Sequence, residues 1–276
     1  MNLLGIDFED WFHPELIQKS LKSEKKEPTV VNGIEKILDW LRKNDTFATF
    51  FVVGELLEFK PDLLDKIIGN GHEIGFHTMD HTRLDAPNFK EKFDEQLKQF
   101  ARLTNGKSKG FRAPSFSLGY STAWALDVLI QNNYVYDSSI VPAKTRLYGV
   151  PNAEQKPYKI SSNILDRNDP AGKLLEFPLL VTSIFGKKIP VAGGFYLRAL
   201  PMKIITDSIS NAEKMEIPAT CYIHSWELTP EFMPNLPLSV MDRFVTYHNL
   251  KKTLSKMDKL IKKFQFTSFE RFLKTM

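Results

Sequence analysis

The sequence is poor in cysteine, in long apolar runs and in charge of one sign. Its 276 residues include one cysteine, Cys221, which cannot form a disulfide within the chain, so nothing requires an oxidising compartment. No stretch of about 18 uninterrupted apolar residues occurs, which argues against a membrane span. The N-terminus lacks the parts of a signal peptide, because acidic residues begin at Asp7. We therefore expect a soluble cytoplasmic protein.

The charge of the chain is nearly balanced, with 37 basic residues against 33 acidic ones and a net charge of +4. This excess is too small and too evenly spread to predict a nucleic-acid surface. Lysine-rich stretches at 22–26 and 251–263 are typical of solvated loop and helix faces. We expect no nucleic-acid partner.

Short apolar runs alternate with amphipathic segments along most of the chain. The pattern predicts strands at 2–10, 46–54, 72–77, 109–114, 174–180 and 219–226, and helices at 31–43, 61–68, 89–103, 121–132, 202–215 and 250–264. This alternation implies an α/β fold in which parallel strands are covered by helices. The length and the 42% hydrophobic content fit one domain over 1–276. Residues 142–172 lack periodicity, and we expect a surface insertion that forms one wall of a substrate groove.

Two histidines four residues apart follow the predicted strand at 72–77. If that segment takes a helical turn, His77 and His81 project from one face and can converge on one cation. From this pair alone, two ordinary surface histidines are an equally good interpretation.

Three acidic residues, Asp7, Glu9 and Asp10, stand at the end of the first predicted strand. A site of two histidines and one carboxylate leaves positions on zinc or a similar ion open for water and substrate. A neighbouring carboxylate can then remove a proton from water that the metal activates. Because burying three unpaired acids costs several kcal/mol, the cluster favours a functional interpretation.

The sequence that contains these histidines and acidic residues resembles the polysaccharide deacetylases of carbohydrate esterase family 4, which carry the NodB homology domain. The resemblance runs in order from Leu3 to about Leu273 and rests on the segments NGHEIGFHTMDH, TFATFFVVG, FRAPSFS and CYIHSWE. The segments FEDWFH, YDSSI, IPVAGGFYLR and HSWE most resemble the branch found in exopolysaccharide and surface-polysaccharide loci. The resemblance implies a deformed (β/α) barrel of about seven parallel strands. It also implies hydrolysis of an N-acetyl group on a sugar.

The resemblance also suggests roles for individual residues. It implies His77 and His81 as metal ligands, Arg112 as the residue that orients the catalytic carboxylate, and His224 as the general acid. The first motif departs from the family, because IDFEDW stands where adjacent aspartates are usual. We expect Asp7 as the base and Asp10 as a metal ligand. In one alternative Glu9 takes the base position, and in another it is the ligand, since Asp7 and Glu9 share one face of a strand.

The expected cofactor is one divalent ion, zinc with cobalt or nickel as alternatives, and the expected substrate is an N-acetylated sugar, oligosaccharide or lipid-linked glycan. Residues beside the catalytic groups are expected to bind the sugar, although core packing competes for the aromatic ones: Trp11, Pro114, Trp226 and Glu227. Two other functions stay open. One is hydrolysis of a cyclic amide without metal, as in the allantoinase-like branch, and the other is carbohydrate binding without catalysis.

Overall fold

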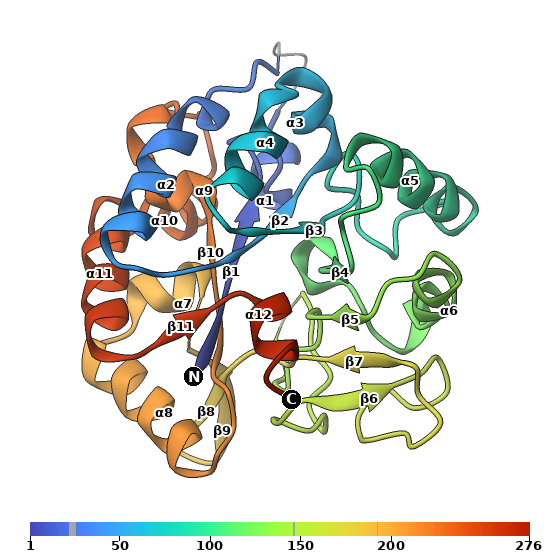
Figure 1. The fold of residues 1–276 in the computed structure, drawn as a ribbon. Coiled ribbons are helices and arrows are strands. Elements are labelled where there is room, and N and C mark those ends of the chain that lie inside the picture. The colour runs from blue at the N-terminus through green and yellow to red at the C-terminus, as the bar shows by residue number, and fades with distance from the viewer. Residues whose placement is uncertain (22–25, 146, 192) are drawn as a thin grey trace.

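A mostly parallel sheet forms the centre of the computed structural model, which describes residues 1–21, 26–145, 147–191 and 193–276 (Figure 1). The strand order is β10-β1-β2-β3-β4-β5-β7-β6, with β11 beside the start of β1. The strands are β1 (Asn2–Phe8), β2 (Thr49–Val52), β3 (Glu73–Phe76), β4 (Gly110–Phe111), β5 (Tyr136–Asp137), β6 (Tyr158–Ile160), β7 (Leu174–Glu176), β10 (Thr220–His224) and β11 (Phe266–Thr267).

The parallel strands curl into a barrel. Only β6 runs antiparallel within the described part of this sheet, and a parallel bridge between Leu179 and Thr220 connects the segment after β7 to β10. The seven strands from β10 to β7 therefore form the deformed (β/α) barrel expected from the sequence, and that prediction is confirmed.

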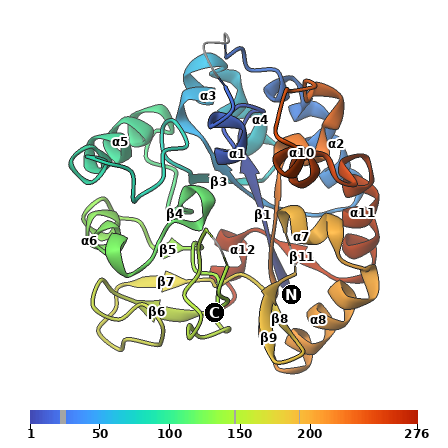
Figure 2. The same ribbon diagram turned by 180° about the vertical axis from the view of Figure 1, so that it is seen from behind.

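Helices cover the outside of this barrel (Figures 1 and 2). The helices of the described chain are α1 (Glu15–Gln18), α2 (Ile34–Lys43), α3 (Gly54–Phe59), α4 (Asp62–Gly69), α5 (Lys90–Leu103), α6 (Trp124–Gln131), α7 (Gly194–Ala199), α8 (Met202–Lys214), α9 (Ser225–Leu228), α10 (Val240–Tyr247), α11 (Thr253–Lys263) and α12 (Phe269–Leu273). Short 3-10 turns lie at Val30–Gly33, Pro114–Phe116, Tyr120–Thr122, Pro230–Phe232 and Leu250–Lys252. No helix in the described part of the chain is long and apolar enough to cross a membrane.

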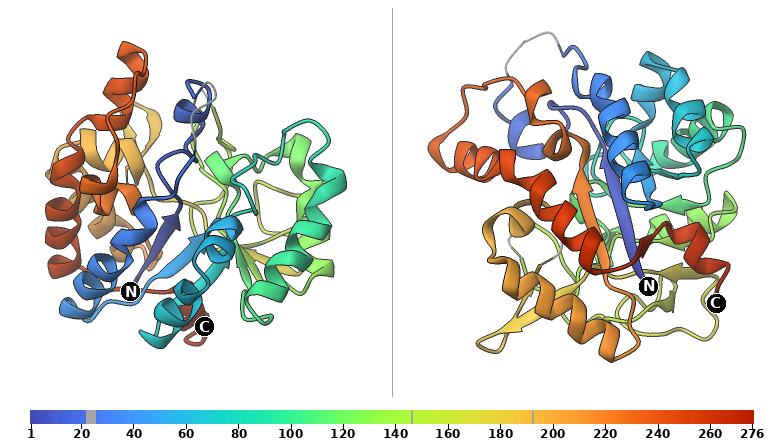
Figure 3. Two further views of the ribbon diagram at one scale, coloured as in Figure 1. Left: turned by 90° about the horizontal axis from the view of Figure 1, so that it is seen from above. Right: turned by 60° about the vertical axis from the view of Figure 1, so that its left-hand side comes forward.

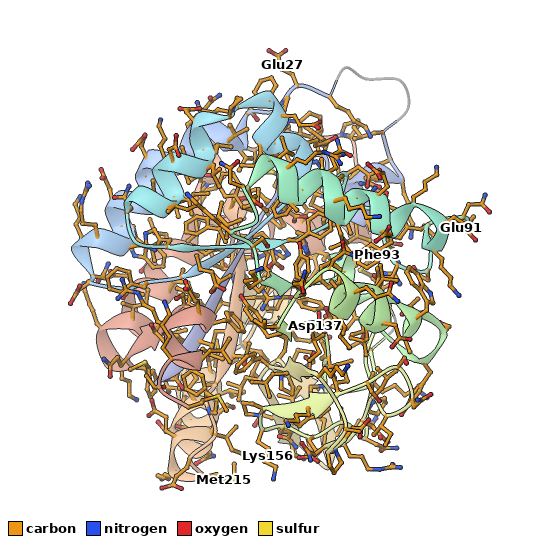
Figure 4. The ribbon with its side chains drawn as sticks, turned by 45° about the vertical axis from the view of Figure 1, so that its right-hand side comes forward. Glu27, Glu91, Phe93, Asp137, Lys156 and Met215 are labelled. Carbon is orange, nitrogen blue, oxygen red and sulfur yellow. The ribbon has the colours of Figure 1, made fainter. Side chains whose placement is uncertain are left out.

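The apolar stripe of α5 illustrates how a helix is held against the sheet. Phe93 and Phe100 are fully buried, and both rings lie close to Phe76 of β3. Figure 4 shows Phe93 turned inward and Glu91, two residues earlier, turned outward. Burial of such a ring contributes about 2–3 kcal/mol. The period of 3.6 residues in the sequence therefore places α5 correctly on the outside of the barrel.

Strand β1 lies inside the sheet, between β10 and β2. All seven of its residues are buried, as expected for a parallel strand that is covered on both faces. In its register with β10, Asp7 lies opposite His224. His77 follows the last residue of β3. Since the carboxyl ends of parallel strands meet at one edge, these side chains gather at the same mouth of the barrel.

The segment 142–172 is only in part the surface insertion that was predicted. Many of its described residues are exposed, and Leu147 and Tyr148 line a cavity, as expected for one wall of a groove. It also contributes strand β6, and several of its apolar side chains are nearly inaccessible to solvent, among them Val150, Tyr158, Ile160 and Leu165. The hairpin of β8 (Val181–Ile184) and β9 (Lys187–Pro190) was not predicted. The lysine-rich stretch 22–26 lies outside the described residues except for Lys26.

Candidate metal and catalytic site

Glu9, His77 and His81 form a buried cluster whose ligand atoms all lie within 4.8 Å of one another. The carboxylate oxygen Oε2 of Glu9 is 2.7 Å from Nε2 of His81, and the two imidazole rings have centroids 4.9 Å apart. One carboxylate and two imidazoles are a donor set that suits zinc and similar divalent ions.

The backbone between the two histidines is a bent loop and not the helical turn assumed from their spacing. Thr78 and His81 have φ angles of 60° and 58°, in the left-handed region that non-glycine residues seldom adopt. The carbonyls of Thr78 and Met79 accept N–H groups from Gly54 and Glu55 at the start of α3, at 3.0 and 2.8 Å. The loop is therefore held by the neighbouring strand-to-helix turn, and this brings both rings to one point.

The His77 ring is held in one orientation by the backbone of the next strand. Its Nδ1 lies 2.7 Å from the carbonyl oxygen of Arg112, and because a carbonyl only accepts, Nδ1 carries the proton and donates it. The lone pair of Nε2 is left for a cation. Burial lowers the pKa of His77 to about 4, so the ring is neutral as a ligand requires.

The Glu9 carboxylate supplies the observation that tests whether a metal fits. Its oxygen Oε1 accepts the indole N–H of Trp226 at 2.8 Å. Its oxygen Oε2 is buried, and its close polar neighbour is Nε2 of His81 at 2.7 Å, without a geometrically satisfactory hydrogen bond to any described residue. Burial alone would raise the pKa of Glu9, but His81 and the other nearby imidazoles lower it below its usual range. A buried, ionised oxygen that faces imidazole nitrogens and is not satisfied by a hydrogen bond fits a divalent cation.

Asp10 does not join this cluster, and its expected role as a ligand is corrected. Its Oδ1 accepts the backbone N–H groups of Trp11 and Thr29 at 2.9 and 3.0 Å, and its Oδ2 accepts that of Val31 at 3.0 Å. Both carboxylate oxygens of Asp10 are therefore engaged by backbone N–H groups, and these bonds hold the loop before α2. The arrangement found is the alternative in which Glu9 faces the histidines from the same side as Asp7.

Asp7 and Arg112 form a buried pair beside the cluster. Arg112 Nη1 donates to Asp7 Oδ1 at 2.7 Å, and its other nitrogens donate to the carbonyl and the hydroxyl of Ser138 at 2.9 Å. The guanidinium also stacks over Phe51, 4.2 Å from the ring centroid. Gly5 makes room for it, because a Cβ there would lie 2.5 Å from Arg112 Nη1. Arg112 therefore holds the Asp7 carboxylate in one orientation.

On the other side of the cluster, His224 is held by a buried carboxylate. Its Nδ1 is 2.7 Å from Glu227, which also accepts from Arg198 at 2.5 Å. Its ring stacks on Trp226 with centroids 5.0 Å apart. Burial lowers the pKa of His224, but Glu227 more than offsets this and raises it to about 9. His224 is thus protonated near neutral pH and able to donate a proton.

A cavity of about 160 Å³ opens onto these groups. Asp7, Glu9, His77, His81 and His224 line its floor, together with Trp226. Its walls carry side chains from six separate segments: Leu16, Phe116, Leu147, Tyr148, Phe195, Tyr222, Val245 and Thr246. An aromatic wall above polar groups is what recognition of a sugar face requires.

Three of the four expected sugar-binding residues do not line this cavity. Trp11 packs in a separate apolar cluster, and its indole N–H donates to the carbonyl of Glu27 at 3.0 Å. Pro114 is buried where its 3-10 turn begins, while Ser115 and Phe116 after it reach the cavity. Glu227 is fully buried and holds His224. Only Trp226 both holds Glu9 and faces the cavity.

Sequence reasoning missed most of the aromatic wall, because its residues are far apart along the chain. One signal was available in the pair Gly193–Gly194 at the start of α7. Gly194 has a φ of 49°, and a Cβ there would lie 2.7 Å from the Tyr222 hydroxyl. The glycines let α7 approach β10 closely, which carries Phe195 to the cavity beside His224.

Comparison with known proteins divides the chain into two parts. Residues 27–134 match the family described as polysaccharide deacetylase, and residues 138–274 match a domain of unknown function, DUF3473. Asp7 and Glu9 precede both matches, His77 and His81 fall in the first, and His224 falls in the second. The cavity thus combines residues from all three segments.

Similar curated proteins match only part of the chain. A peptidoglycan-N-acetylglucosamine deacetylase from Bacillus cereus is 40% identical over 81 residues, which are 29% of this chain and 28% of that protein. An uncharacterised protein from Geobacillus stearothermophilus is 35% identical over 94 residues, or 31% and 36% of the two chains. The chain thus covers about a third or less of the length of each.

Two solved structures share the fold over almost the whole chain. A protein from Mycobacterium smegmatis described as a polysaccharide deacetylase has a TM-score of 0.59 at 13% identity, covering 99% of this chain and 90% of its own. An allantoinase has a TM-score of 0.54 at 14% identity, with coverage of 96% and 86%. At this identity the likeness extends to the fold alone.

Proposed function

Because residues 27–134 match the polysaccharide deacetylase family, we propose that this chain is a metal-dependent hydrolase that removes N-acetyl groups from a sugar or polysaccharide. The observation that carries the proposal is the buried cluster of Glu9, His77 and His81 beside the Asp7–Arg112 pair. The ion is zinc, or cobalt or nickel, since imidazole and carboxylate donors suit all three.

The reaction needs a water molecule to attack the acetamide carbonyl carbon. Glu9, His77 and His81 would hold the divalent cation, which when bound would supply Lewis-acid activation of that water. Asp7 faces the same cavity and accepts the proton that the water loses. Arg112 keeps this carboxylate aimed, because its guanidinium has no other anionic partner among the described residues.

Departure of the amine requires a proton from the opposite side of the cavity. His224 supplies it through Nε2, because Nδ1 is engaged by Glu227. The carbon–nitrogen bond then breaks to release acetate and an amino sugar. The turn Pro114–Phe116 borders the cavity through Ser115, and we assign its backbone to stabilisation of the developing oxyanion.

The substrate class follows from the aromatic wall and from the relatives. By their names, related proteins act on peptidoglycan N-acetylglucosamine and on chitooligosaccharide, which supports an N-acetylated glycan here. We place the glycan in exopolysaccharide or surface-polysaccharide synthesis, as the segments FEDWFH and HSWE suggest. We also propose a cytoplasmic location, which cell fractionation tests.

The first experiment is metal analysis by mass spectrometry on protein purified without chelators, beside the variants His77→Ala and His81→Ala. We expect near-stoichiometric divalent metal in the parent and little in either variant, with release of acetate from acetylated chitooligosaccharides lost in parallel. Asp7→Asn should retain the metal while turnover falls about a thousandfold.

Three outcomes would redirect the proposal. Unchanged turnover in Asp7→Asn would move the base elsewhere. Hydrolysis of a cyclic amide that survives chelation would favour the metal-independent alternative. A chain that binds oligosaccharide and metal but releases no acetate would be a non-catalytic relative, as is known for a pseudoenzyme of carbohydrate esterase family 4 from Bacillus anthracis that shares this fold.

A further inference from the structure

Helix α10 carries exposed apolar side chains beside the catalytic cavity. Val240, Met241 and Phe244 are 90%, 68% and 51% exposed, on a surface where a helix in water normally presents polar groups. In the left view of Figure 3 this orange-red helix projects from the body of the protein. Val240 and Met241 are not buried by any packing within the described chain, so the core does not explain why these positions are apolar.

The apolar surface of α10 continues into the cavity. The ring of Phe244 lies 5.9 Å from that of Phe195 on α7, measured between centroids. Phe195 lines the cavity, as do Val245 and Thr246 of α10 itself. The helix is therefore part of the cavity wall on one side and an exposed apolar surface on the other.

Basic residues without acidic partners adjoin this surface. Arg243, Lys251 and Lys252 are all exposed, and they border a depression of about 570 Å³ together with Tyr247 and Asn249. Arg243 donates to the side-chain oxygen of Asn235 and not to a carboxylate. None of the three cations forms a salt bridge within the described part of the chain. Apolar side chains on α10 thus lie near cationic ones that come from α10 itself and from the 3-10 turn Leu250–Lys252 that follows it.

We propose that α10 with Arg243, Lys251 and Lys252 is a surface that docks on an anionic phospholipid bilayer. An apolar helix face enters the boundary between headgroups and acyl chains, while neighbouring cations are attracted to lipid phosphates. The same three cations disfavour a second copy of the chain as the occupant, because a symmetric contact would bring like charges together. Charge complementarity therefore favours a phosphate-rich surface.

Docking in this way would hold the cavity mouth against the membrane. If the proposed deacetylation is correct, on which this step alone rests, the substrate class that fits is an N-acetylated glycan carried on a lipid. The docking itself does not depend on catalysis, and vesicle binding measures it without any acetate release.

The experiment measures co-sedimentation of the full chain with vesicles of phosphatidylcholine alone or mixed equally with phosphatidylglycerol. We expect binding to the mixed vesicles, weaker binding at high salt and little binding to phosphatidylcholine. Met241→Ser with Phe244→Ser should weaken the binding about tenfold. Lys251→Glu with Lys252→Glu should abolish the preference for phosphatidylglycerol.

Matched controls distinguish membrane binding by the α10 surface from nonspecific binding by any exposed apolar or basic residue. Met215→Ser with Phe59→Ser removes the same residue types at 62% and 56% exposure elsewhere (Met215 is labelled in Figure 4), and it should leave binding unchanged. Lys262→Glu with Lys263→Glu, at the far end of α11, should likewise preserve the lipid preference. Circular dichroism confirms that each variant is folded.

Three results would overturn the proposal. The first is that the unsubstituted protein co-sediments with neither kind of vesicle. The second is an equal loss of binding in the α10 variant and its matched control. The third is a dimer in analytical ultracentrifugation that disappears with Met241→Ser and Phe244→Ser, which would make a second copy the occupant of this surface.

Discussion

Two buried glutamates at opposite ends of the barrel have different hydrogen-bond partners, and their pKa values are shifted in opposite directions. Glu9, just after β1, lies among imidazoles at the mouth, and His81 and its neighbours hold its pKa below the usual range against the effect of burial. Glu73, at the start of β3, accepts from the hydroxyls of Thr49 and Tyr136 and from the backbone N–H of Glu270. Burial raises its pKa to about 7.

The difference teaches that burial alone does not mark a reactive carboxylate. Neutral hydroxyl donors satisfy Glu73 and connect strands inside the barrel, whereas Glu9 keeps one oxygen without a hydrogen-bond partner among the described residues. At the mouth the acids have nitrogen partners that can be cationic or bind a cation. A buried carboxylate oxygen that faces such groups and is not satisfied by a hydrogen bond is the feature that indicates chemistry.

The sharpest test of this comparison replaces each glutamate by glutamine. Glu9→Gln should lose the metal and lower acetate release by about a thousandfold or more, because an amide oxygen is a much weaker ligand than a carboxylate. Glu73→Gln should retain both, since an amide oxygen still accepts from Tyr136. The measurements are the metal content and the rate of acetate release of the two variants. Equal losses of metal and activity in both variants would contradict the difference described between Glu9 at the mouth and Glu73 in the interior.

The second test removes the cation that partners Asp7. Arg112→Met should lower the free energy of unfolding by about 3–5 kcal/mol, because the Asp7 carboxylate is left buried without its partner. Urea unfolding measures this loss. As a control, Arg83→Met breaks a partly exposed pair with Asp85 and should cost about 1 kcal/mol or less. A loss of that small size in Arg112→Met would contradict the role assigned to this pair.

The third test uses pH. Because the folded-state pKa of Glu73 is raised to about 7 from an ordinary value of 4.5, the folded chain keeps a proton that the unfolded chain loses between those values. The stabilising effect is complete below the unfolded pKa and is lost as pH rises through the folded one.

Urea unfolding of the parent and of Glu73→Gln at about pH 5 and about pH 8 measures this effect. The parent should lose about 3 kcal/mol relative to the variant over that interval. Parallel stability curves for the two proteins would show that Glu73 does not titrate in this way.

The smallest effect concerns the hydrogen bond that holds Glu9. Trp226→Phe keeps an aromatic ring against His224 but removes the indole N–H donated to Glu9, and we expect metal affinity to fall about tenfold. Competition with a chelating dye measures it. Trp40→Phe is the control, because the indole N–H of Trp40 has no partner in the described structure and its loss should leave metal affinity unchanged.

The alternation of strands and helices was predictable from the chain because each element carries its own period of apolar residues. Elements such as α5 and β3 appear within one or two residues of their expected positions. For the region 142–172 the sequence predicted an irregular segment that forms one wall of a groove, and Leu147 and Tyr148 do line the cavity. Strand β6 within it and the hairpin of β8 and β9 were not predicted, since packing without a repeating pattern leaves no signal in the sequence.

The sequence by itself determined which residue types were available at the mouth, namely two histidines behind one strand, an arginine behind another and three acids behind the first. It could not decide which acid faces the histidines. Tertiary structure decided this, because the N–H groups of Thr29 and Val31 engage Asp10, while the turn after β1 brings Glu9 beside His81. Spacing describes neighbours along a chain, and a site depends on contacts that only folding brings together.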